Sequence, residues 1–352
     1  LVFSAIVSGL TSIPDMKKIY RMAVKAFILF IVMTALAILT GMVFGNLFKP
    51  GVGASIVMPV TESVETTDVS FISTILNMFP TNIFEALSTD NMLQVIVFAF
   101  FFGICIVLCG EKAEPVKVFF DRVAQVMYKM TDVVIGFAPI GVCGIMADMI
   151  GKYGLSTLLP LCKFIIVLHI ALIVFIFGIQ GLLVFLGVRM SPLKFYKGII
   201  GGISMALATD SSAAALPVTI KELQNNLGVS EAVASFIMSV VTNVSKSGSA
   251  LYQGMTVIFI AQVAGVALTL PQQLTVFVTA LLASLGTAGV PSASIVMLTM
   301  TLGCVNLPLE GVALMTGIDR IIGGQRTTPN VITNAAVAAI VEKQEKKVVQ
   351  KR

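Results

Sequence analysis

Long apolar stretches separated by short polar segments dominate the pattern of this chain. A helix needs about 20 mostly apolar residues to cross a bilayer. Stretches that approach or exceed this length occur at residues 26–48, 92–110, 123–150 (broken by Pro139), 158–188, 233–267 and 332–341 with its upstream neighbour. Residues 51–68 read as an aqueous loop and residues 80–89 as a short re-entry. The pattern therefore predicts an all-α membrane protein, a bundle of several spanning helices.

Two further segments have a small, polar centre between apolar arms that are too short to cross. One is residues 201–227, with a tip at residues 209–217, and the other is residues 271–302, with a centre at residues 284–294. Irregular backbone at membrane depth is tolerated only where protein or a water-filled cavity satisfies it. Each segment therefore predicts a helical hairpin that enters the membrane and returns, and such a pair points to the substrate site of a transporter.

Residues 242–249 interrupt the apolar span 233–267 with hydroxyl groups, an amide, glycine and one charge, Lys246. A charge and a glycine within a span predict local unwinding. Unwound backbone exposes carbonyls and amides that can coordinate ions or substrate.

Composition supports a membrane protein. Hydrophobic residues make up 57% of the 352 residues and charged residues 12%, against roughly 25% charged in soluble domains. A soluble enzyme, a disordered regulator and a nucleic-acid binder are excluded. The net charge of +5 is concentrated in residues 17–25, 189–197 and 343–352, and short basic segments mark the cytoplasmic side. We expect a multi-pass protein of the plasma membrane with a cytoplasmic C-terminus. One histidine leaves no confident metal site, and no cofactor is expected.

Several motifs follow one another in an order that is typical of a known family. They are Ser211-Ser212 with Leu-Pro-Val-Thr at 216–219, Gly-Ser-Ala-Leu-Tyr-Gln at 248–253, Gly-Thr-Ala-Gly-Val-Pro at 286–291, and Asp319 followed by Arg326-Thr327-x-x-Asn330. With these motifs the chain resembles the dicarboxylate/amino acid:cation symporters, the family of glutamate transporters and bacterial C4-dicarboxylate carriers.

The resemblance implies a homotrimer in which each protomer has a scaffold domain and a transport domain that moves as a rigid elevator. The expected divisions are scaffold at 1–20, a transport-domain helix at 21–48, scaffold at 49–156, transport domain at 157–342 and a basic tail at 343–352. Within the transport domain we expect hairpin 1 at about 193–227, a broken helix at about 229–266, hairpin 2 at about 271–304 and the last helix at about 308–342.

Arg326 is the strongest candidate for a substrate-binding residue. A cation deep in a span normally faces a partner or a cavity, and a planar guanidinium suits bidentate binding of a carboxylate. The resemblance implies that Arg326 binds the distal carboxylate of the substrate; the alternative is a structural ion pair with Asp319. The other contacts that the resemblance implies are Thr327, Asn330, Ser211, Ser212, Ser249, Val290 and Ser294.

Position 323 departs from the family pattern. Amino acid carriers of the family place there an Asp that binds the substrate's ammonium, whereas this chain has Gly323. An ammonium without a carboxylate partner is costly to desolvate. We therefore expect a dicarboxylate without an amino group, such as succinate, fumarate or malate. The alternative is an acidic amino acid, glutamate or aspartate, whose amine is bound by Asp210; Asp210 is equally suited to an ion pair with Arg320 or another cation.

The motif that binds the coupling cation in the family also differs in this chain. The family motif Asn-Met-Asp-Gly-Thr is here Ser245-Lys246-Ser247-Gly248-Ser249, and Asn334 replaces a sodium-binding Asp. Sodium prefers hard oxygen ligands, and a lysine among them would repel it. We hypothesise that the Lys246 ammonium replaces a coupling cation, which makes transport sodium-independent and either proton-coupled, with this lysine as one possible proton carrier, or exchanging.

Two alternatives remain open: Lys246 snorkels to water or pairs with Asp319, and a residual sodium site exists at Asn243, Ser284 and Thr287. The complete set of cation-site candidates is Lys246, Asp319, Asn334, Asn243, Ser245 and Ser247.

Other functions fit less well. Ser245 and Lys246 could suggest a membrane hydrolase, but neighbouring side chains on a helix point about 100° apart. A channel has no need of occluding hairpins. We therefore expect a transporter and not an enzyme, whose partners are the substrate, the lipid bilayer, further copies of itself and, for proton coupling, protons.

Overall fold

The computed structural model describes residues 2–11, 18–54, 79–88, 92–136, 158–231, 233–234, 237–238, 242, 245–285 and 293–350. Within these ranges the regular structure is helical, without strands. The helices are α1 (Val2–Thr11), α2 (Lys18–Phe48), α4 (Ile83–Ser88), α5 (Met92–Cys109), α6 (Glu114–Gly136), α8 (Leu158–Val174), α9 (Gly181–Leu183), α10 (Pro192–Gly198), α11 (Ile200–Thr209), α12 (Ser212–Leu227), α14 (Ser247–Val263), α15 (Leu270–Leu285), α16 (Ala293–Gly303) and α17 (Glu310–Gln350). The π-helical segments Phe175–Gln180 and Val184–Val188 flank α9.

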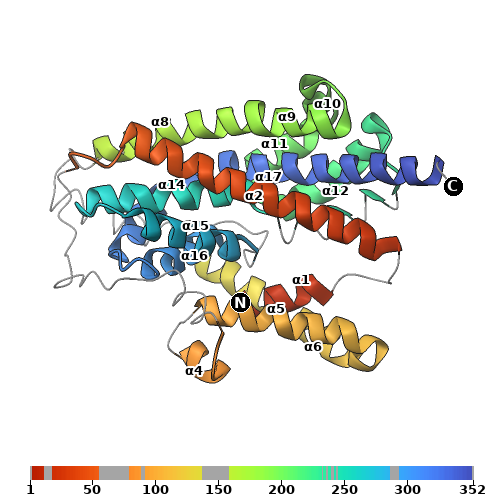
Figure 1. The fold of residues 1–352 in the computed structure, drawn as a ribbon, viewed down its shortest axis with the longest axis horizontal. Helices are drawn as coiled ribbons and strands as arrows, with labels where there is room; N and C mark the ends of the chain where they lie inside the picture. The colour runs from red at the N-terminus through yellow and green to blue at the C-terminus, as the bar shows by residue number, and fades with distance from the viewer. Residues whose placement is uncertain are drawn as a thin grey trace.

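Long helices from distant parts of the chain form the main bundle (Figure 1): α2, α8, α14 and α17 lie against one another. A second group, α1, α5 and α6, lies along one side of this bundle and contacts it through α15. The chain therefore crosses between the two groups more than once, and residues far apart in sequence share one core.

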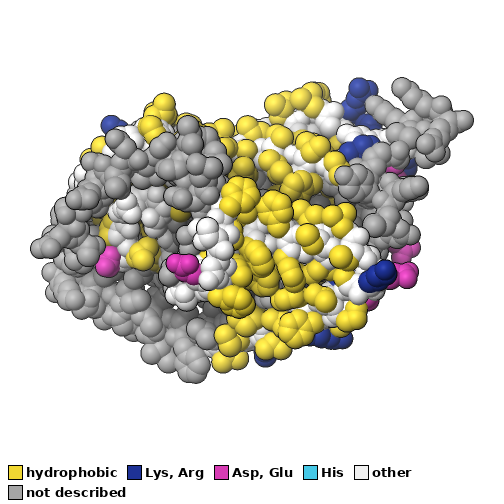
Figure 2. Space-filling view, turned by 60° about the horizontal axis from the view of Figure 1, so that its bottom comes forward, with side chains coloured by type: hydrophobic (Ala, Val, Ile, Leu, Met, Phe, Trp, Pro, Cys, Tyr) yellow, Lys and Arg dark blue, Asp and Glu magenta, His cyan; other side chains and the backbone are white. Residues whose placement is uncertain are grey.

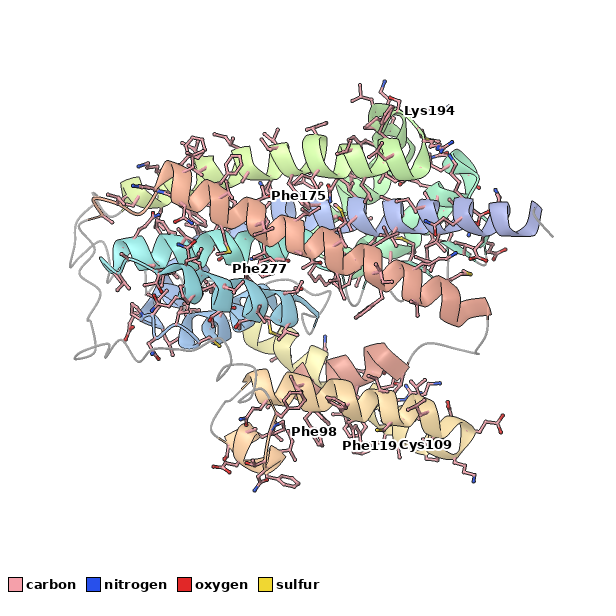
Figure 3. The ribbon with its side chains drawn as sticks, viewed as in Figure 1. Phe98, Cys109, Phe119, Phe175, Lys194 and Phe277 are labelled. Atoms are coloured by element: carbon pink, nitrogen blue, oxygen red, sulfur yellow. The ribbon has the colours of Figure 1, made fainter. Side chains whose placement is uncertain are left out.

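The core of the main bundle is centred on α14, most of which is buried. It packs most closely against α2, where a Cβ on Gly41 would collide with the backbone carbonyl of Leu251. Phe175, which Figure 3 labels, is the first residue of the π-helical segment that follows α8 and is fully buried in the same core. A smaller cluster joins α1 and α5 to the second hairpin through Ala283 and Met297.

The outside of the molecule is rich in large apolar side chains, many of them on α2 and on the α8–α9 segment. Figure 2 shows a broad face on which hydrophobic side chains predominate. Two described helices, Val24–Phe48 and Pro160–Val188, are long and apolar enough to cross a membrane.

The predicted helices at 26–48, 92–110 and 158–188 are confirmed as α2, α5 and the continuous helical segment from α8 to Val188. Other predictions were wrong in their bounds. The helix expected from residue 123 already begins at Glu114, and residues 137–150 of that stretch lie outside the described residues. The last helix continues to Gln350 instead of ending near 342. Polar residues can extend a helix beyond its apolar stretch, and the pattern of apolar residues does not detect them.

Most of the basic segment 17–25 belongs to α2, which begins at Lys18. Lys25 forms an ion pair with Glu345 at 3.1 Å. This ion pair links the N-terminal part of α2 to the C-terminal part of α17.

The first hairpin consists of α11 and α12, joined at Asp210 and Ser211. The carboxylate of Glu222, late in α12, accepts hydrogen bonds of 2.8 Å from the backbone N–H groups of Gly201 and Gly202 at the start of α11. The two arms are therefore antiparallel and tied at their base. The second hairpin consists of α15 and α16, which pack together. Residues 286–292 of its predicted centre, 284–294, lie outside the described residues.

Candidate functional site

Arg326 lies in the middle of α17 and is only 2% exposed. Its Nη1 is 2.6 Å from Oδ1 of Asp319, which precedes it by two helical turns and therefore lies on the same face. Its Nη2 is 3.6 Å from Oδ2 of Asp210 at the tip of the first hairpin. The guanidinium also lies 5.0 Å from the ring centre of Tyr252 on α14, a cation–π distance. A buried cation is thus held by two acids and one aromatic ring.

The start of α14 is docked on α17 next to this cation. The backbone N–H of Gly248 donates to Oδ1 of Asn330 at 2.7 Å, and the Ser247 hydroxyl is 2.9 Å from the Thr333 hydroxyl. A Cβ on Gly248 would collide with the backbone carbonyl of Arg326, so only glycine permits this approach. The break in the broken helix therefore lies beside Arg326.

The break itself is shorter than predicted. Ser245 and Lys246 are non-helical, but residues 247–249, which the sequence predicted to be unwound, form the first turn of α14. The Ser247 hydroxyl and the Gly248 N–H are compatible with this helical turn because groups of α17 satisfy them. Ser249 is buried in this turn.

Lys246 points into the protein and is 2% exposed. Its ammonium donates to the Ser212 hydroxyl at 2.7 Å and to the backbone carbonyl of Thr242 at 2.6 Å. Both interactions are charge-assisted. The side chain does not snorkel to the surface, and Asp319 is paired with Arg326. Lys246 links the broken helix to the first hairpin through oxygen atoms.

Asp210 adopts the left-handed conformation, with φ 49° and ψ 33°, which Asp and Asn tolerate better than most residues. Its Oδ1 accepts a 2.6 Å hydrogen bond from the Thr327 hydroxyl. Its carboxylate also lies against Gly323, where a Cβ would come within 2.6 Å of Asp210 Cγ. The space that a side chain at position 323 would enter is thus filled by the Asp210 carboxylate. Among the described side chains, Arg326 is a cation that pairs with Asp210; the side chain of Arg320 lies outside them.

The remaining predicted residues divide into two groups. Ser211 caps α12 by accepting a hydrogen bond from the N–H of Ala214 at 3.2 Å, Asn334 lies 3.5 Å from the Thr242 hydroxyl, and the Ser284 hydroxyl donates within its own helix at 2.7 Å. The Ser245 hydroxyl is buried without a hydrogen-bond partner among the described residues. Asn243, Thr287 and Val290 and the side chain of Ser294 lie outside the described part.

The structure adds Gln180, which sequence reasoning missed. Its amide donates to the backbone carbonyl of Pro329 at 2.7 Å and to the Thr333 hydroxyl at 2.7 Å. Gln180 is fully buried and supports the part of α17 that carries the site. A lone amide within the apolar span 158–188 was the available signal, because polar side chains inside spans usually have a function.

The arrangement brings together Arg326, Lys246, Asp210 and Asp319 at the meeting point of a hairpin tip, a helix break and α17. The model of the sodium:dicarboxylate symporter family matches residues 1–344. The chain belongs to this family.

Curated relatives support this membership over nearly the whole chain. The proton/sodium-glutamate symport protein of Bacillus caldotenax is 35% identical, over 98% of this chain and 83% of the relative. The proton/glutamate-aspartate symporter of Escherichia coli is 32% identical, over 100% and 83%. The C4-dicarboxylate transport protein of Cupriavidus taiwanensis is 33% identical, also over 100% and 83%. The family is one of membrane transporters, and these relatives divide between acidic amino acids and dicarboxylates.

Proposed function

We propose that this chain carries a small dicarboxylate without an amino group, of the succinate, fumarate or malate type, across the cell membrane without sodium. The observation that carries the proposal is the Lys246 ammonium, which is buried and donates to a hydroxyl and a backbone carbonyl. Oxygen atoms of these two kinds are ligands that sodium prefers. The ammonium therefore supplies a tethered positive charge where a coupling cation would otherwise bind.

Arg326 binds one substrate carboxylate in this proposal. Its guanidinium is positioned by Asp319 and Tyr252, and its planar fork matches a carboxylate. The helices α12 and α14 begin close by, at Ser212 and Ser247, and helix N-termini favour anions. Gly323 offers no charge to an amine. Together these groups suit a dianion.

The family resemblance supports the mode of movement that we propose. The transport domain, residues 21–48 and 157–342, moves as an elevator against the scaffold, residues 1–20 and 49–156, within a homotrimer whose C-terminal segment is cytoplasmic. The packing of α1 against α5 and α6 supports this division, and the two hairpins are the re-entrant elements that enclose the substrate.

Uptake of labelled succinate into proteoliposomes tests the proposal. Uptake should persist when choline replaces sodium, whereas strict sodium dependence would contradict it. Arg326→Gln provides the control without substrate binding, and liposomes without protein give the background.

A second candidate is an acidic amino acid symporter. It is favoured by the Asp210 carboxylate, which occupies the space beside Gly323 and could receive the substrate's ammonium there. Competition between aspartate and succinate in one binding assay separates the two candidates. Stronger inhibition by succinate supports the dicarboxylate, and stronger inhibition by aspartate supports the amino acid.

A further inference from the structure

The two carboxylates that face Arg326 are held very differently. The Asp319 side chain is 3% exposed and lies 2.6 Å from the guanidinium, within hydrogen-bond distance. The Asp210 side chain is 16% exposed and lies 3.6 Å away, beyond it. Asp319 belongs to the same helix as Arg326, whereas Asp210 is on a hairpin tip. A carboxylate arriving from outside therefore competes with Asp210 for the guanidinium much more readily than with Asp319.

The geometry of the guanidinium leads to the same conclusion. An arginine has five N–H donors in a planar fork, and Nε of Arg326 has no hydrogen-bond partner among the described residues. The Asp319 pair uses Nη1. Bidentate binding of a new carboxylate needs two neighbouring donors, here Nε and Nη2. Because Nη2 now faces Asp210, a carboxylate that binds both donors takes the place of Asp210.

Among the described side chains, the charged groups around Asp210 come from α17 and from the broken helix. α17 contributes Arg326 and, through it, Asp319. The broken helix contributes Lys246, whose ammonium is bonded to Ser212, two residues after Asp210. The formal charges of these four groups cancel. A bound dianion leaves two uncompensated negative charges in a buried site, and a proton on Asp210 removes one of them.

We propose that Asp210 is an internal counter-ion of Arg326, that a substrate carboxylate replaces it, and that the released Asp210 takes up one proton from the aqueous phase. The ion pair with Asp210 opens, the pair with the substrate forms, and the carboxylate of Asp210 becomes a carboxylic acid that returns the proton when the substrate leaves. This inference rests on the proposed function, and it assigns the coupled proton to the hairpin and not to Lys246.

Asp210→Asn tests the inference. The amide tolerates the left-handed conformation and can still accept the hydrogen bond from Thr327, so that the hairpin tip is retained while the negative charge and the titrating group are lost. Calorimetry of succinate binding at neutral pH, in two buffers that differ in ionisation enthalpy, gives the number of protons taken up. We expect one for the unchanged protein and none for Asp210→Asn. The variant should also bind succinate several-fold more tightly, because the internal competitor is weakened.

Proteoliposomes give the second readout. An inward proton gradient should drive accumulation of succinate by the unchanged protein but not by Asp210→Asn, which should still exchange labelled for unlabelled succinate. Asp121→Asn is the matched control, since Asp121 also accepts a hydrogen bond from a hydroxyl, that of Ser8 at 3.0 Å, but lies on α6. This control should retain proton-driven accumulation.

Several outcomes overturn the inference. Binding of succinate to the unchanged protein without proton uptake does so, even if no Asp210 variant folds. Retained proton uptake in Asp210→Asn, or its loss only in Lys246→Met, assigns the proton elsewhere. Loss of aspartate binding alone in Asp210→Asn makes this residue an amine partner. If the unchanged protein neither binds nor exchanges succinate, the proposed function itself fails.

Discussion

The contact between Asp210 and Gly323 predicts that the site can hold one carboxylate at this point but not two. Gly323→Asp introduces the acid that the family resemblance implies for amino acid carriers. A Cβ at this position would lie 2.6 Å from Asp210 Cγ and 3.1 Å from Oδ1, closer than non-bonded atoms approach. Two like charges 4 Å apart repel by about 4 kcal/mol at an effective dielectric of 20. We therefore expect Gly323→Asp to destabilise the protein by about 4 kcal/mol, with the steric clash adding to this cost.

A second substitution should restore much of this loss. Asp210→Ser removes both the clash and the repulsion, so that the double variant should be more stable than the sum of the single effects. For residues in contact, such coupling energies reach about 3 kcal/mol. The carboxylate of the double variant then projects from α17, and aspartate should compete better with labelled succinate than it does in the unchanged protein.

Unfolding of the four proteins in mixed micelles with increasing SDS, followed by circular dichroism, measures the coupling. The chain has no tryptophan, so fluorescence is less suitable. Gly303→Ala is the steric control, because a Cβ there meets nothing within 4 Å. Gly323→Ala should be clearly less stable than this control. Additive effects of Gly323→Asp and Asp210→Ser, or full stability of Gly323→Asp, would refute the reasoning.

Three further predictions concern the surroundings of the site. Lys246→Met should weaken sodium-free succinate binding about tenfold or more, because a charged donor contributes about 1.5–3 kcal/mol; unchanged binding by equilibrium dialysis would favour a structural lysine. Gln180→Leu should lower the free energy of unfolding by about 1–3 kcal/mol, since it removes the donor from the Pro329 carbonyl, and SDS titration would show whether it does. Near the C-terminal end of α17, burial raises the pKa of Glu342, but hydrogen bonds from Ser230 and Lys346 outweigh it and hold this pKa below its usual value. The contribution of the ionised Glu342 to stability is present above its unfolded-state pKa and is lost as the pH falls through the lower folded-state pKa. Thermal stability should therefore drop below about pH 4 in the unchanged protein, and it should drop less in Glu342→Gln.

The apolar pattern was sufficient to locate α2, α5 and the helical segment from α8 to Val188, because a long run of apolar residues is stable only where lipid or a protein core surrounds it. It was weaker at helix ends. The charged residues before position 123 and after position 342 continue their helices, and such ends depend on partners such as the Lys25–Glu345 pair. These partners are 320 residues apart and leave no local signal.

In the site, too, some features have a local signal in the sequence and others depend on distant partners. Arg326 and Lys246 stand out in the sequence because each is a charge within an apolar stretch, and the two hairpins are apparent from their small polar centres. The sequence also shows directly that position 323 is a glycine and carries no acid. The sequence did not reveal that Gln180 supports the backbone carbonyl of Pro329, because the two residues come from separate helices.

The sequence alone predicted the lipid surroundings of this protein and the helical type of its elements, because composition and periodicity are sums over single positions. The order of its motifs carried the resemblance to its family. The tertiary structure decided which charges meet. It brings Asp210 from a hairpin tip against Gly323 and Arg326, and Lys246 from a helix break against Ser212. The physical reason is that an electrostatic interaction depends on the distance between groups in space, and the packing of α11, α14 and α17 sets that distance.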